Sequence, residues 1–404
     1  MAKILFVHHF FPGQFGFIAT ALVEAGNEVV ALGGRTASEL PGVSLVRWQN
    51  KRGTTPNILP TAVRAEADMI RAAAALEAAR GLLERGFSPD VIIAHPGWGE
   101  TLYLRELWPN ARLILHAEFF YSATGGELGF DPEFGTVTLV DRCRAVSKSA
   151  TLALAYSQAD RLVAPTPFQA SRLPECFRSR TTVIHEGVDL QEMRPTPGAR
   201  VTVGEKTFDR NRPLVTFASR VLEPLRGCHT FFRALPRILD DIPDAEIVIA
   251  GAETGAGYGL SPPENETWKS HFWKEIEGRV DPARIHFVGW LPNETLNALM
   301  SIARAHVYLT YPFVLSWSLL EAMACEALVI GSDTPPLHDV IVNGENGLLV
   351  DFLRQDLLAE AIVEACRHPE RFQGMRAAAR QSMLAHYDRR NVCLPQWLDL
   401  VRST

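Results

Sequence analysis

The chain has no excess of positive charge, because 40 Lys and Arg residues stand against 46 Asp and Glu residues in 404, a formal net charge of −6. Proteins that bind a nucleic acid backbone need a basic face, so this balance argues against a nucleic acid partner. No apolar run reaches the roughly 18 residues of a membrane span, and the apolar stretch before Pro12 is too short for a signal sequence. We therefore expect a cytoplasmic protein.

Cysteine is sparse, with six residues and no Cys-x-x-Cys pair or histidine partner at zinc spacing. This pattern predicts buried or idle thiols in a reducing compartment and gives no sign of a metal site. The segment after the first expected strand also lacks the Gly-x-Gly-x-x-Gly fingerprint, which argues against a dinucleotide-dependent oxidoreductase.

Short apolar runs alternate with helical patterns along the first half of the chain. A strand over residues 3–9 ends at a Pro-Gly turn and leads into a helix over 17–25, and a long Ala-, Leu- and Glu-rich helix is expected over 61–85. Further strands are expected at 29–32, 43–48, 91–94, 112–116 and 161–165. Such alternation predicts a mostly parallel sheet covered by helices.

The pattern restarts after a polar, Pro- and Gly-containing stretch at 193–212, with strands expected at 213–219, 246–251, 285–289, 305–310 and 328–331. Since 47% of the residues are hydrophobic, the chain supports two cores. We predict the α/β class, with two doubly wound parallel-sheet domains over 1–195 and 205–384. Residues 253–268 are expected to form a long irregular loop, and 386–404 a final amphipathic helix.

Polar residues follow the strand ends of the first half, where open α/β sheets bind ligands. Gly13 lies in the turn after the first strand and allows close approach of an anion to a helix N-terminus, although a plain structural turn explains it equally well. His95 opens the block His-Pro-Gly-Trp-Gly-Glu at 95–100, and His116 is followed by Glu118. These groups suit acid-base or hydrogen-bonding roles, against which stands a structural role in the core.

Two segments carry the candidates of the second half. Arg220 and Arg226 follow its first strand and suit a diphosphate, because a guanidinium matches phosphate oxygens; a solvated loop is the alternative. A helix is expected to begin near Ser316, which would cap it and direct free N–H groups at a ligand. Glu321 lies in the apolar part of that helix and suits the two vicinal hydroxyls of a ribose.

At these residues the sequence resembles the GT-B glycosyltransferases of family 4. The motifs that carry the resemblance are Phe6-Val-His-His-Phe-Phe-Pro-Gly-Gln-Phe15, residues 94–100, Phe130-Asp-Pro-Glu-Phe134, Glu186-Gly-Val-Asp189, the Arg220 and Arg226 loop, Leu319-Leu-Glu-Ala-Met-Ala324 and Val329-Ile-Gly-Ser-Asp333. The first two resemble a bacterial subgroup in particular. The resemblance implies two Rossmann-like domains facing across a cleft, with the helix over 385–404 returning to the first domain.

The resemblance implies transfer of a sugar from a nucleotide sugar to an acceptor, with the anomeric configuration retained. UDP or GDP is the expected nucleotide, and the acceptor is a sugar, a lipid-linked molecule or a protein. The acceptor would bind to the N-terminal domain and the donor to the C-terminal one. Arg220 and Arg226 match the pair that binds the donor diphosphate, Gly13 and Gln14 the loop that faces the phosphates, and Glu321 the ribose ligand. His116 matches a histidine beside the anomeric centre. We take His116, Glu118 and His95 as the candidate catalytic residues, with His116 and Glu118 positioning groups rather than acting as a nucleophile.

One position departs from the family pattern, because Phe313 stands where the first Glu of the Glu-x7-Glu motif is expected, and Ser316 replaces its usual glycine. That Glu normally contacts the transferred sugar. Its absence keeps open a catalytically silent GT-B protein that binds a glycan or a partner. A GT-B nucleotide-sugar epimerase is a separate alternative.

The chain has no Asp-x-Asp metal clamp, so we expect no cofactor and no essential metal. Contact with the inner face of a membrane through the arginines at 172, 178 and 180 is one alternative, and a solvated loop is the other. A homodimer also stays open as an alternative to a single chain.

Overall fold

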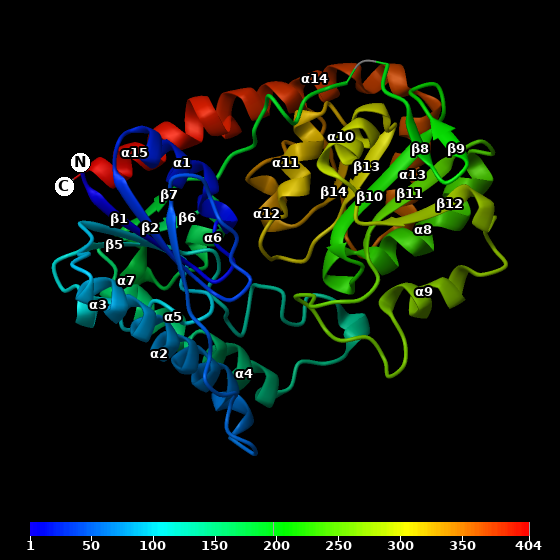
Figure 1. Cartoon of the computed structure of the whole chain (residues 1–404). Helices are drawn as coiled ribbons and strands as arrows, with labels where there is room; N and C mark the ends of the chain where they lie inside the picture. The colour runs from blue at the N-terminus through cyan, green and yellow to red at the C-terminus, as the bar shows by residue number, and fades with distance from the viewer. Residues whose placement is uncertain (197, 404) are drawn as a thin grey trace. The chain divides into compact units, whose positions relative to one another are not determined.

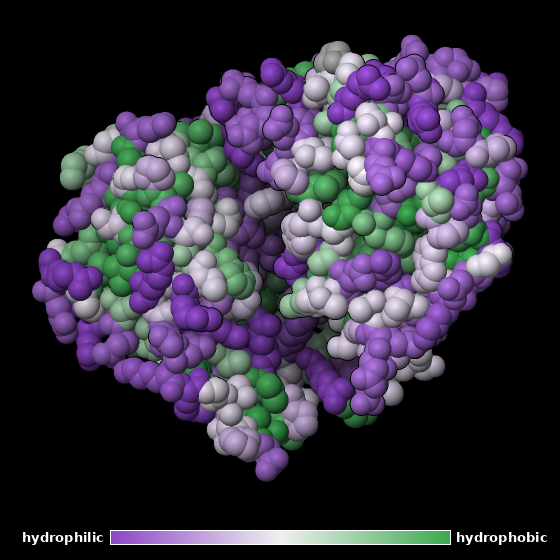
Figure 2. Space-filling view, turned by 45° about the vertical axis from the view of Figure 1, so that its right-hand side comes forward, coloured by the Kyte–Doolittle hydropathy of each residue, from purple (hydrophilic) through white to green (hydrophobic). Residues whose placement is uncertain are grey.

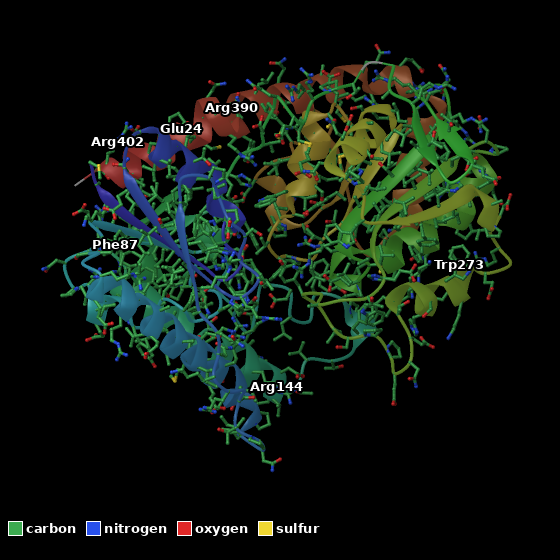
Figure 3. All side chains as sticks on the ribbon, viewed as in Figure 1. Glu24, Phe87, Arg144, Trp273, Arg390 and Arg402 are labelled. Carbon is green, nitrogen blue, oxygen red and sulfur yellow. The ribbon has the colours of Figure 1, made fainter. Side chains whose placement is uncertain are left out.

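The computed structural model describes residues 1–196 and 198–403, and its internal contacts divide the chain into two compact units (Figure 1). Unit 1 comprises Met1–Glu186 and Cys393–Thr404, and unit 2 comprises Gly187–Val392. Each unit is built on a parallel sheet with helices along it, and side chains fill the space between the layers (Figure 3). The predicted α/β class with two parallel sheets is thus confirmed.

Unit 1 holds a seven-stranded sheet in the order β3-β2-β1-β4-β5-β6-β7, and all neighbouring strands pair in parallel. The strand order reverses between β1 and β4, the position at which doubly wound sheets bind ligands. Its strands are β1 (Lys3–His8), β2 (Glu28–Gly33), β3 (Ser44–Arg47), β4 (Val91–Ala94), β5 (Arg112–His116), β6 (Arg161–Ala164) and β7 (Thr181–Val183). Its helices are α1 (Gly16–Glu24), α2 (Val63–Glu84), α3 (Leu104–Leu107), α4 (Leu139–Lys148), α5 (Ala150–Gln158), α6 (Pro167–Ser171), α7 (Glu175–Arg178) and α15 (Leu394–Arg402), with short 3-10 turns η1 (Gly13–Phe15), η2 (Pro60–Ala62) and η3 (Pro132–Phe134).

The sheet of unit 1 is buried on both faces, because successive side chains of a strand point to opposite sides. Leu5 and Val7 of β1 pack in one core with α2 and α5. Ile4 and Phe6 pack in a second core with α1 and α15. Phe87, labelled in Figure 3, closes the first core just beyond the end of α2.

Unit 2 holds a six-stranded parallel sheet in the order β12-β11-β10-β13-β14-β15. Its strands are β10 (Leu214–Val221), β11 (Glu246–Ala252), β12 (Ile285–Gly289), β13 (Ala305–Tyr308), β14 (Val329–Ser332) and β15 (Leu348–Val350). Its helices are α8 (Cys228–Asp241), α9 (Trp268–Ile276), α10 (Asn293–Ile302), α11 (Trp317–Ala324), α12 (Pro335–His338), α13 (Gln355–Arg367) and α14 (Gln373–Ser382), with 3-10 turns η4 (Pro224–Arg226), η5 (Pro282–Arg284) and η6 (Pro369–Phe372).

The stretch at 193–212 carries an element that was not predicted. It contains the antiparallel hairpin of β8 (Val201–Val203) and β9 (Lys206–Phe208), which Lys206 ties to Glu246 at 2.8 Å. The six cysteines are all free; Cys228, Cys325 and Cys393 are buried, whereas Cys143 and Cys176 are exposed.

The expected continuous helix at 386–404 is wrong in one respect, because the segment is interrupted. Two π-helical turns, η7 (Met383–Tyr387) and η8 (Arg389–Cys393), precede α15, and Asp388 between them is extended. Asp388 pairs with Val188 as a bridge, and its carboxylate accepts the N–H groups of Arg390 and Asn391, which makes it the N-cap of the segment that follows. Thr404 lies outside the described residues.

The surface of each unit is mixed, with hydrophilic residues over much of the face shown in Figure 2 and apolar ones among them. In the part of the chain that the structure describes, no helix is both long and apolar enough to span a membrane.

Trp397 of α15 is fully buried in the core with α1, and its ring lies parallel to that of His116 at 6.4 Å between centroids. We expect Trp397→Ala to lower the free energy of unfolding of unit 1 by about 3–5 kcal/mol through the cavity it leaves, and Trp397→Phe to lower it less. Trp290→Ala is the control, because Trp290 is 70% exposed and its loss should change stability by less than about 0.5 kcal/mol. Urea unfolding followed by circular dichroism measures the three, and equal losses for Trp397→Ala and Trp290→Ala would contradict the packing of α15.

Candidate active site

The loop after β1 is held by a neutral histidine. His8 Nδ1 accepts the N–H of Phe10 at 2.9 Å, so the ring proton is on Nε2, which donates to Gln14 Oε1 at 2.7 Å. Burial, and then the charge of His95, lower the pKa of His8 to about 3, so the ring is neutral at pH 7. Gly13 has φ +47°, and a Cβ there would lie 2.5 Å from the His8 ring. The glycine is therefore required by this histidine as well as by its backbone conformation.

Glu118 is the carboxylate that joins the loops after β1 and β4. Gln14 Nε2 donates to Glu118 Oε1 at 3.2 Å, and His95 Nε2 lies 3.4 Å from Glu118 Oε2. The N–H of Gly97 donates to His95 Nδ1 at 3.1 Å, which places the His95 proton on the side of Glu118. Burial would raise the pKa of Glu118, but His95, and more weakly His116, outweigh it and lower the pKa. The side chain keeps 31% of its surface exposed, so an ionised carboxylate is accessible here.

His116 is held by a partner that the sequence analysis did not name as a site residue. Its Nε2 lies 2.7 Å from Glu186 Oε1. Burial alone would raise the pKa of Glu186, but this hydrogen bond and the charge of His185 outweigh burial and lower the pKa to about 2. His116 is 1% exposed, and its Nδ1 has no hydrogen-bond partner among the described residues. Its ring stacks on His95 at 5.4 Å between centroids. The free Nδ1 is thus an acceptor left open for a ligand.

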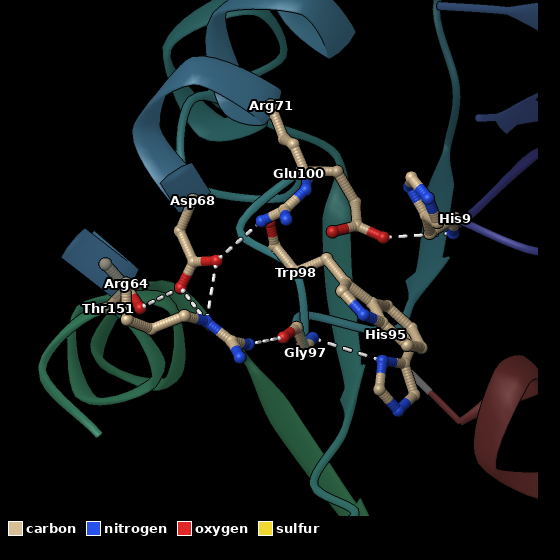
Figure 4. Close-up of polar contacts among 9 residues, drawn as sticks. All are labelled: His9, Arg64, Asp68, Arg71, His95, Gly97, Trp98, Glu100 and Thr151. Carbon is tan, nitrogen blue, oxygen red and sulfur yellow. Dashed lines mark hydrogen bonds and ion pairs between the residues drawn. The ribbon is translucent and has the colours of Figure 1, made fainter. Parts of the chain in front are cut away.

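The His-Pro-Gly-Trp-Gly-Glu loop rests on a charged cluster of α2 (Figure 4). Asp68 is buried and forms ion pairs with Arg64 at 2.9 Å and Arg71 at 3.0 Å, and Thr151 donates to it at 2.6 Å. A Cβ at Gly99 would lie 2.4 Å from Asp68 Cβ, so only glycine lets the loop approach the helix this closely. The sequence signal for this cluster was an aspartate flanked by two arginines at helical spacing.

The same two arginines then reach the loop backbone. Arg64 donates to the carbonyl of Gly97, and Arg71 donates to the carbonyl of Trp98 at 3.2 Å. Gly97 is the residue whose N–H fixes His95 (Figure 4). The helix therefore positions His95 through one residue of loop backbone.

Glu100 and Glu118 differ in charge, since one is neutral and the other is ionised. Glu100 is 1% exposed, accepts the N–H of His9 at 3.0 Å through Oε1, and leaves Oε2 without a partner among the described residues. Burial raises its pKa to about 8. At pH 7 Glu100 is a neutral acid, while Glu118 is a carboxylate.

The predicted pair of arginines in unit 2 meets on one aromatic ring. Arg226 is 8% exposed and donates to Thr310 Oγ1 at 2.9 Å, beyond the carboxyl end of β13, whereas Arg220 on β10 is exposed and donates to the carbonyl of Ala256 at 2.6 Å. Their guanidinium carbons lie 5.9 and 4.6 Å from the centroid of Tyr258. Tyr258 belongs to the irregular loop predicted at 253–268, so that loop takes part in the site.

Glu223 fixes this loop and was missed by the sequence analysis. Its buried carboxylate accepts the N–H of Tyr258 at 3.0 Å and that of Gly259 at 2.8 Å. A buried carboxylate that accepts backbone N–H groups orders a loop. Phe313, at the position of the missing Glu, is 2% exposed and packs on Tyr258 with 5.2 Å between ring centroids.

Ser316 is the N-cap of α11, as predicted. Its Oγ accepts the N–H of Ser318 at 3.4 Å, and its own N–H donates to the hydroxyl of Tyr308 at 2.6 Å. Tyr308 also lies 3.4 Å from Arg226, so one hydroxyl links the arginine to the helix N-terminus.

Glu321 lies farther along α11 and is partly buried. Burial raises its pKa, and the charge of Arg389 opposes this. Within the described residues its carboxylate makes no hydrogen bond, so its acceptor capacity is unused.

Residues 25–193 match the family model described as glycosyl transferase family 4 group, and residues 203–382 match glycosyl transferases group 1. The chain belongs to the GT-B glycosyltransferases of the family 4 type. The D-inositol 3-phosphate glycosyltransferase of Rhodococcus erythropolis is 27% identical to this chain over 296 residues, which cover 67% of this chain and 64% of the relative. The alpha-maltose-1-phosphate synthase of Mycolicibacterium smegmatis is 26% identical over 57% of this chain and 58% of the relative.

Solved structures show the same GT-B fold over the whole chain. Sucrose-phosphate synthase from Thermosynechococcus elongatus has a TM-score of 0.73 at 17% identity and covers 100% of this chain and 98% of its own. HepE from Anabaena, in complex with UDP-glucose, has a TM-score of 0.65 at 16% identity, with 100% of both chains covered. The matched regions span 48% to 64% of the length of the D-inositol 3-phosphate glycosyltransferases. The bacterial subgroup inferred from residues 94–100 stays a prediction.

The neutral Glu100 makes the stability of this glycosyltransferase depend on pH. Its pKa is about 8 in the folded chain against 4.5 ordinarily, so between these values the folded state holds a proton that the unfolded state releases, and stability falls as pH rises. Between pH 5 and pH 8 the free energy of unfolding of the wild type should fall by roughly 2–4 kcal/mol because of Glu100. Glu100→Gln should not show this fall, because the glutamine keeps the shape of the side chain and is neutral at every pH.

Unfolding by urea at pH 5, 6.5 and 8 measures the difference. The control is Glu106→Gln, because Glu106 is exposed on α3. If the wild-type and Glu100→Gln stabilities run parallel over this range, Glu100 is not held neutral by burial.

Proposed function

We propose that this chain is a retaining glycosyltransferase that moves a sugar from a nucleoside diphosphate sugar to a hydroxyl acceptor in bacterial glycan or glycoconjugate synthesis. UDP and GDP are the preferred nucleotides, and the acceptor is a sugar, a lipid-linked molecule or a protein. One observation carries the proposal. The hydroxyl of Tyr308 joins Arg226 to the N-terminus of α11, and Arg220 and Arg226 both lie over the ring of Tyr258.

The donor diphosphate is proposed to bind to unit 2, beside Arg226. Breaking the bond to the sugar places negative charge on the departing diphosphate, and preformed positive groups stabilise that charge most when they need not reorganise. Arg226 is already held by Thr310, and the first N–H groups of α11 are fixed by the Ser316 cap. The two arginines and the helix N-terminus supply this charge without a metal, so we propose that none is essential.

Glu321 is proposed to accept the two ribose hydroxyls of the nucleotide. Its partly buried carboxylate has no competing hydrogen bond within the described residues, and a diol offers two donors. HepE is in complex with UDP-glucose, which supports a nucleotide sugar as the donor of this GT-B chain as well.

The acceptor is proposed to bind to unit 1, at the loops after β1, β4 and β5. His116 offers its free Nδ1 there, and the ionised Glu118 offers a hydrogen-bond acceptor. In a retaining reaction on one face of the sugar, the departing phosphate takes the acceptor proton. His116, Glu118 and His95 then position hydroxyl groups, and none of them becomes a covalent nucleophile.

The donor sugar is proposed to be recognised differently from that of other family members, because Phe313 offers no hydrogen bond to its hydroxyls. A thermal-shift screen over UDP-, GDP-, ADP- and dTDP-sugars identifies the donor. Consumption of that donor with and without acceptor separates the proposed transferase from an epimerase. A donor that binds but is never consumed indicates a silent binding protein.

The arginines at 172, 178 and 180 have internal partners, since each donates to backbone carbonyl groups of unit 1. These hydrogen bonds hold the loops of unit 1 and leave the three positive charges uncancelled. Membrane contact and a homodimer stay predictions.

Arg226→Ala is expected to lower kcat by about 10²–10³ at saturating donor, because one guanidinium stabilises the departing diphosphate. Arg226→Lys should keep more activity than Arg226→Ala, since lysine keeps the positive charge but cannot donate two parallel hydrogen bonds as the guanidinium does. Arg279→Ala, at an exposed position, is the control. The assays contain EDTA, so activity lost on chelation refutes the metal-free proposal, and wild-type kcat in Arg226→Ala refutes the role of Arg226.

Glu321→Gln is expected to raise the donor KM about tenfold with a smaller effect on kcat, because it weakens ribose binding by about 1.4 kcal/mol. Glu360→Gln on the exposed face of α13 serves as the control. The direct readout is the Kd for UDP or GDP by calorimetry. An unchanged Kd in Glu321→Gln would show that another group holds the ribose.

A further inference from the structure

A cavity of about 290 Å³ in unit 2 is lined by Arg210, Arg304, Pro369, Glu370, Gln373 and Arg376. Arg210 precedes β10 and Arg304 precedes β13, so the cavity lies at the amino edge of the six-stranded sheet. Arg226 and the other donor-binding candidates lie at the carboxyl edge of the same parallel strands. The cavity and the proposed donor site therefore lie at opposite edges of one sheet.

Three guanidinium groups face this cavity, and Glu370 is the one carboxylate among its lining residues. Within the described residues Arg210 and Arg304 form no side-chain hydrogen bond or ion pair, and the Nε of Arg304 is buried with no partner. Arg376 is 5% exposed and is fixed by the carbonyls of Glu326 at 2.8 Å and Ala303 at 2.9 Å. Burial, and then the charges of Arg210 and Arg304, lower the pKa of Arg376 to about 10, and the charge of Glu326 opposes them only in part. The arginines thus destabilise each other in the absence of an anion.

The N-terminus of α14 adds to the positive potential. This ten-residue helix begins at Gln373, whose side chain lines the cavity, and no side chain caps its first turn. The N–H of Gln373 already donates to the carbonyl of Glu370, so the helix contributes the positive end of its dipole, which favours a negative group. Glu370 is the one acidic residue of the lining; its side chain is 64% exposed, and it pairs with His368 at 3.6 Å. One solvated carboxylate does not balance three arginines.

We propose that this cavity binds a small anion that carries a phosphate group, at a site separate from the nucleotide sugar. Planar guanidinium groups match the tetrahedral oxygens of phosphate and bind them in pairs. A buried Nε without a partner marks a donor that a ligand oxygen would satisfy. The cavity volume is at the lower end for ligand pockets, which favours inorganic phosphate or a phosphorylated small molecule over a polymer.

Thermal unfolding of the full chain tests the site, with inorganic phosphate, a hexose phosphate and citrate compared at matched ionic strength against sodium chloride. We expect a phosphate-bearing ligand to raise Tm by about 2–4 °C at saturation. Calorimetry with the most stabilising ligand should give one binding site per chain. The comparison among the phosphate probes shows whether the ligand is the free ion or a phosphate ester.

Arg304→Gln and Arg210→Gln should abolish this stabilisation and lower the affinity for the phosphate probe at least tenfold. Both are preferred to a change at Arg376, which also holds backbone carbonyls. Arg279→Gln is the matched control, and Arg226→Ala should respond to phosphate like the wild type, because it changes the opposite edge of the sheet.

Three outcomes would overturn the proposal. In the first, no phosphate probe raises Tm above the chloride control. In the second, Arg304→Gln and Arg210→Gln respond like the wild type while Arg226→Ala loses the response, which places phosphate in the donor site. In the third, citrate stabilises as strongly as phosphate, which makes the cavity a general anion site.

Discussion

Hydrogen bonding between buried histidines and buried acids holds the carboxyl edge of the first sheet together. A charge that leaves water must be paired or neutralised, and unit 1 uses both solutions within a few residues. Glu186 stays ionised because His116 donates to it, whereas His8 and Glu100 are kept neutral. The loops that follow β1, β4 and β5 are thereby fixed to one another, which is the preorganisation that the proposed group transfer would require.

Unit 2 meets the same constraint with cations in place of acids. Arg226 is buried among hydroxyl groups and an aromatic ring rather than beside a carboxylate. Its charge is consequently solvated by the protein but not cancelled, and it remains available to an anion. Glu223, the nearby buried acid, is instead occupied by backbone N–H groups of the loop that carries Tyr258. The separation of these roles lets a carboxylate and an arginine share one loop without forming an ion pair.

The sequence predicted what depends on local pattern. Strand runs, the start of α11 at Ser316 and the long loop at 253–268 follow from periodicity and capping, and each is present. Contacts between distant residues were not predictable, since Asp68 beneath the loop at 95–100 and Glu186 beside His116 depend on how helices and strands pack. The hairpin of β8 and β9 and the break at Asp388 were missed for a related reason, because short extended segments carry little periodic signal.

The position of Trp397 in the chain has a consequence for synthesis on the ribosome. Unit 1 is complete in sequence to Glu186, yet the indole that fills the core beside α1 follows about 200 residues of unit 2. At roughly 5–20 residues per second, the ribosome needs about 10–40 s to translate that stretch. During this interval the nascent first unit has an unfilled apolar slot beside β1 and α1, which exposes it to chaperones and to wrong partners. The last helix thus makes completion of the first unit wait for translation of the second.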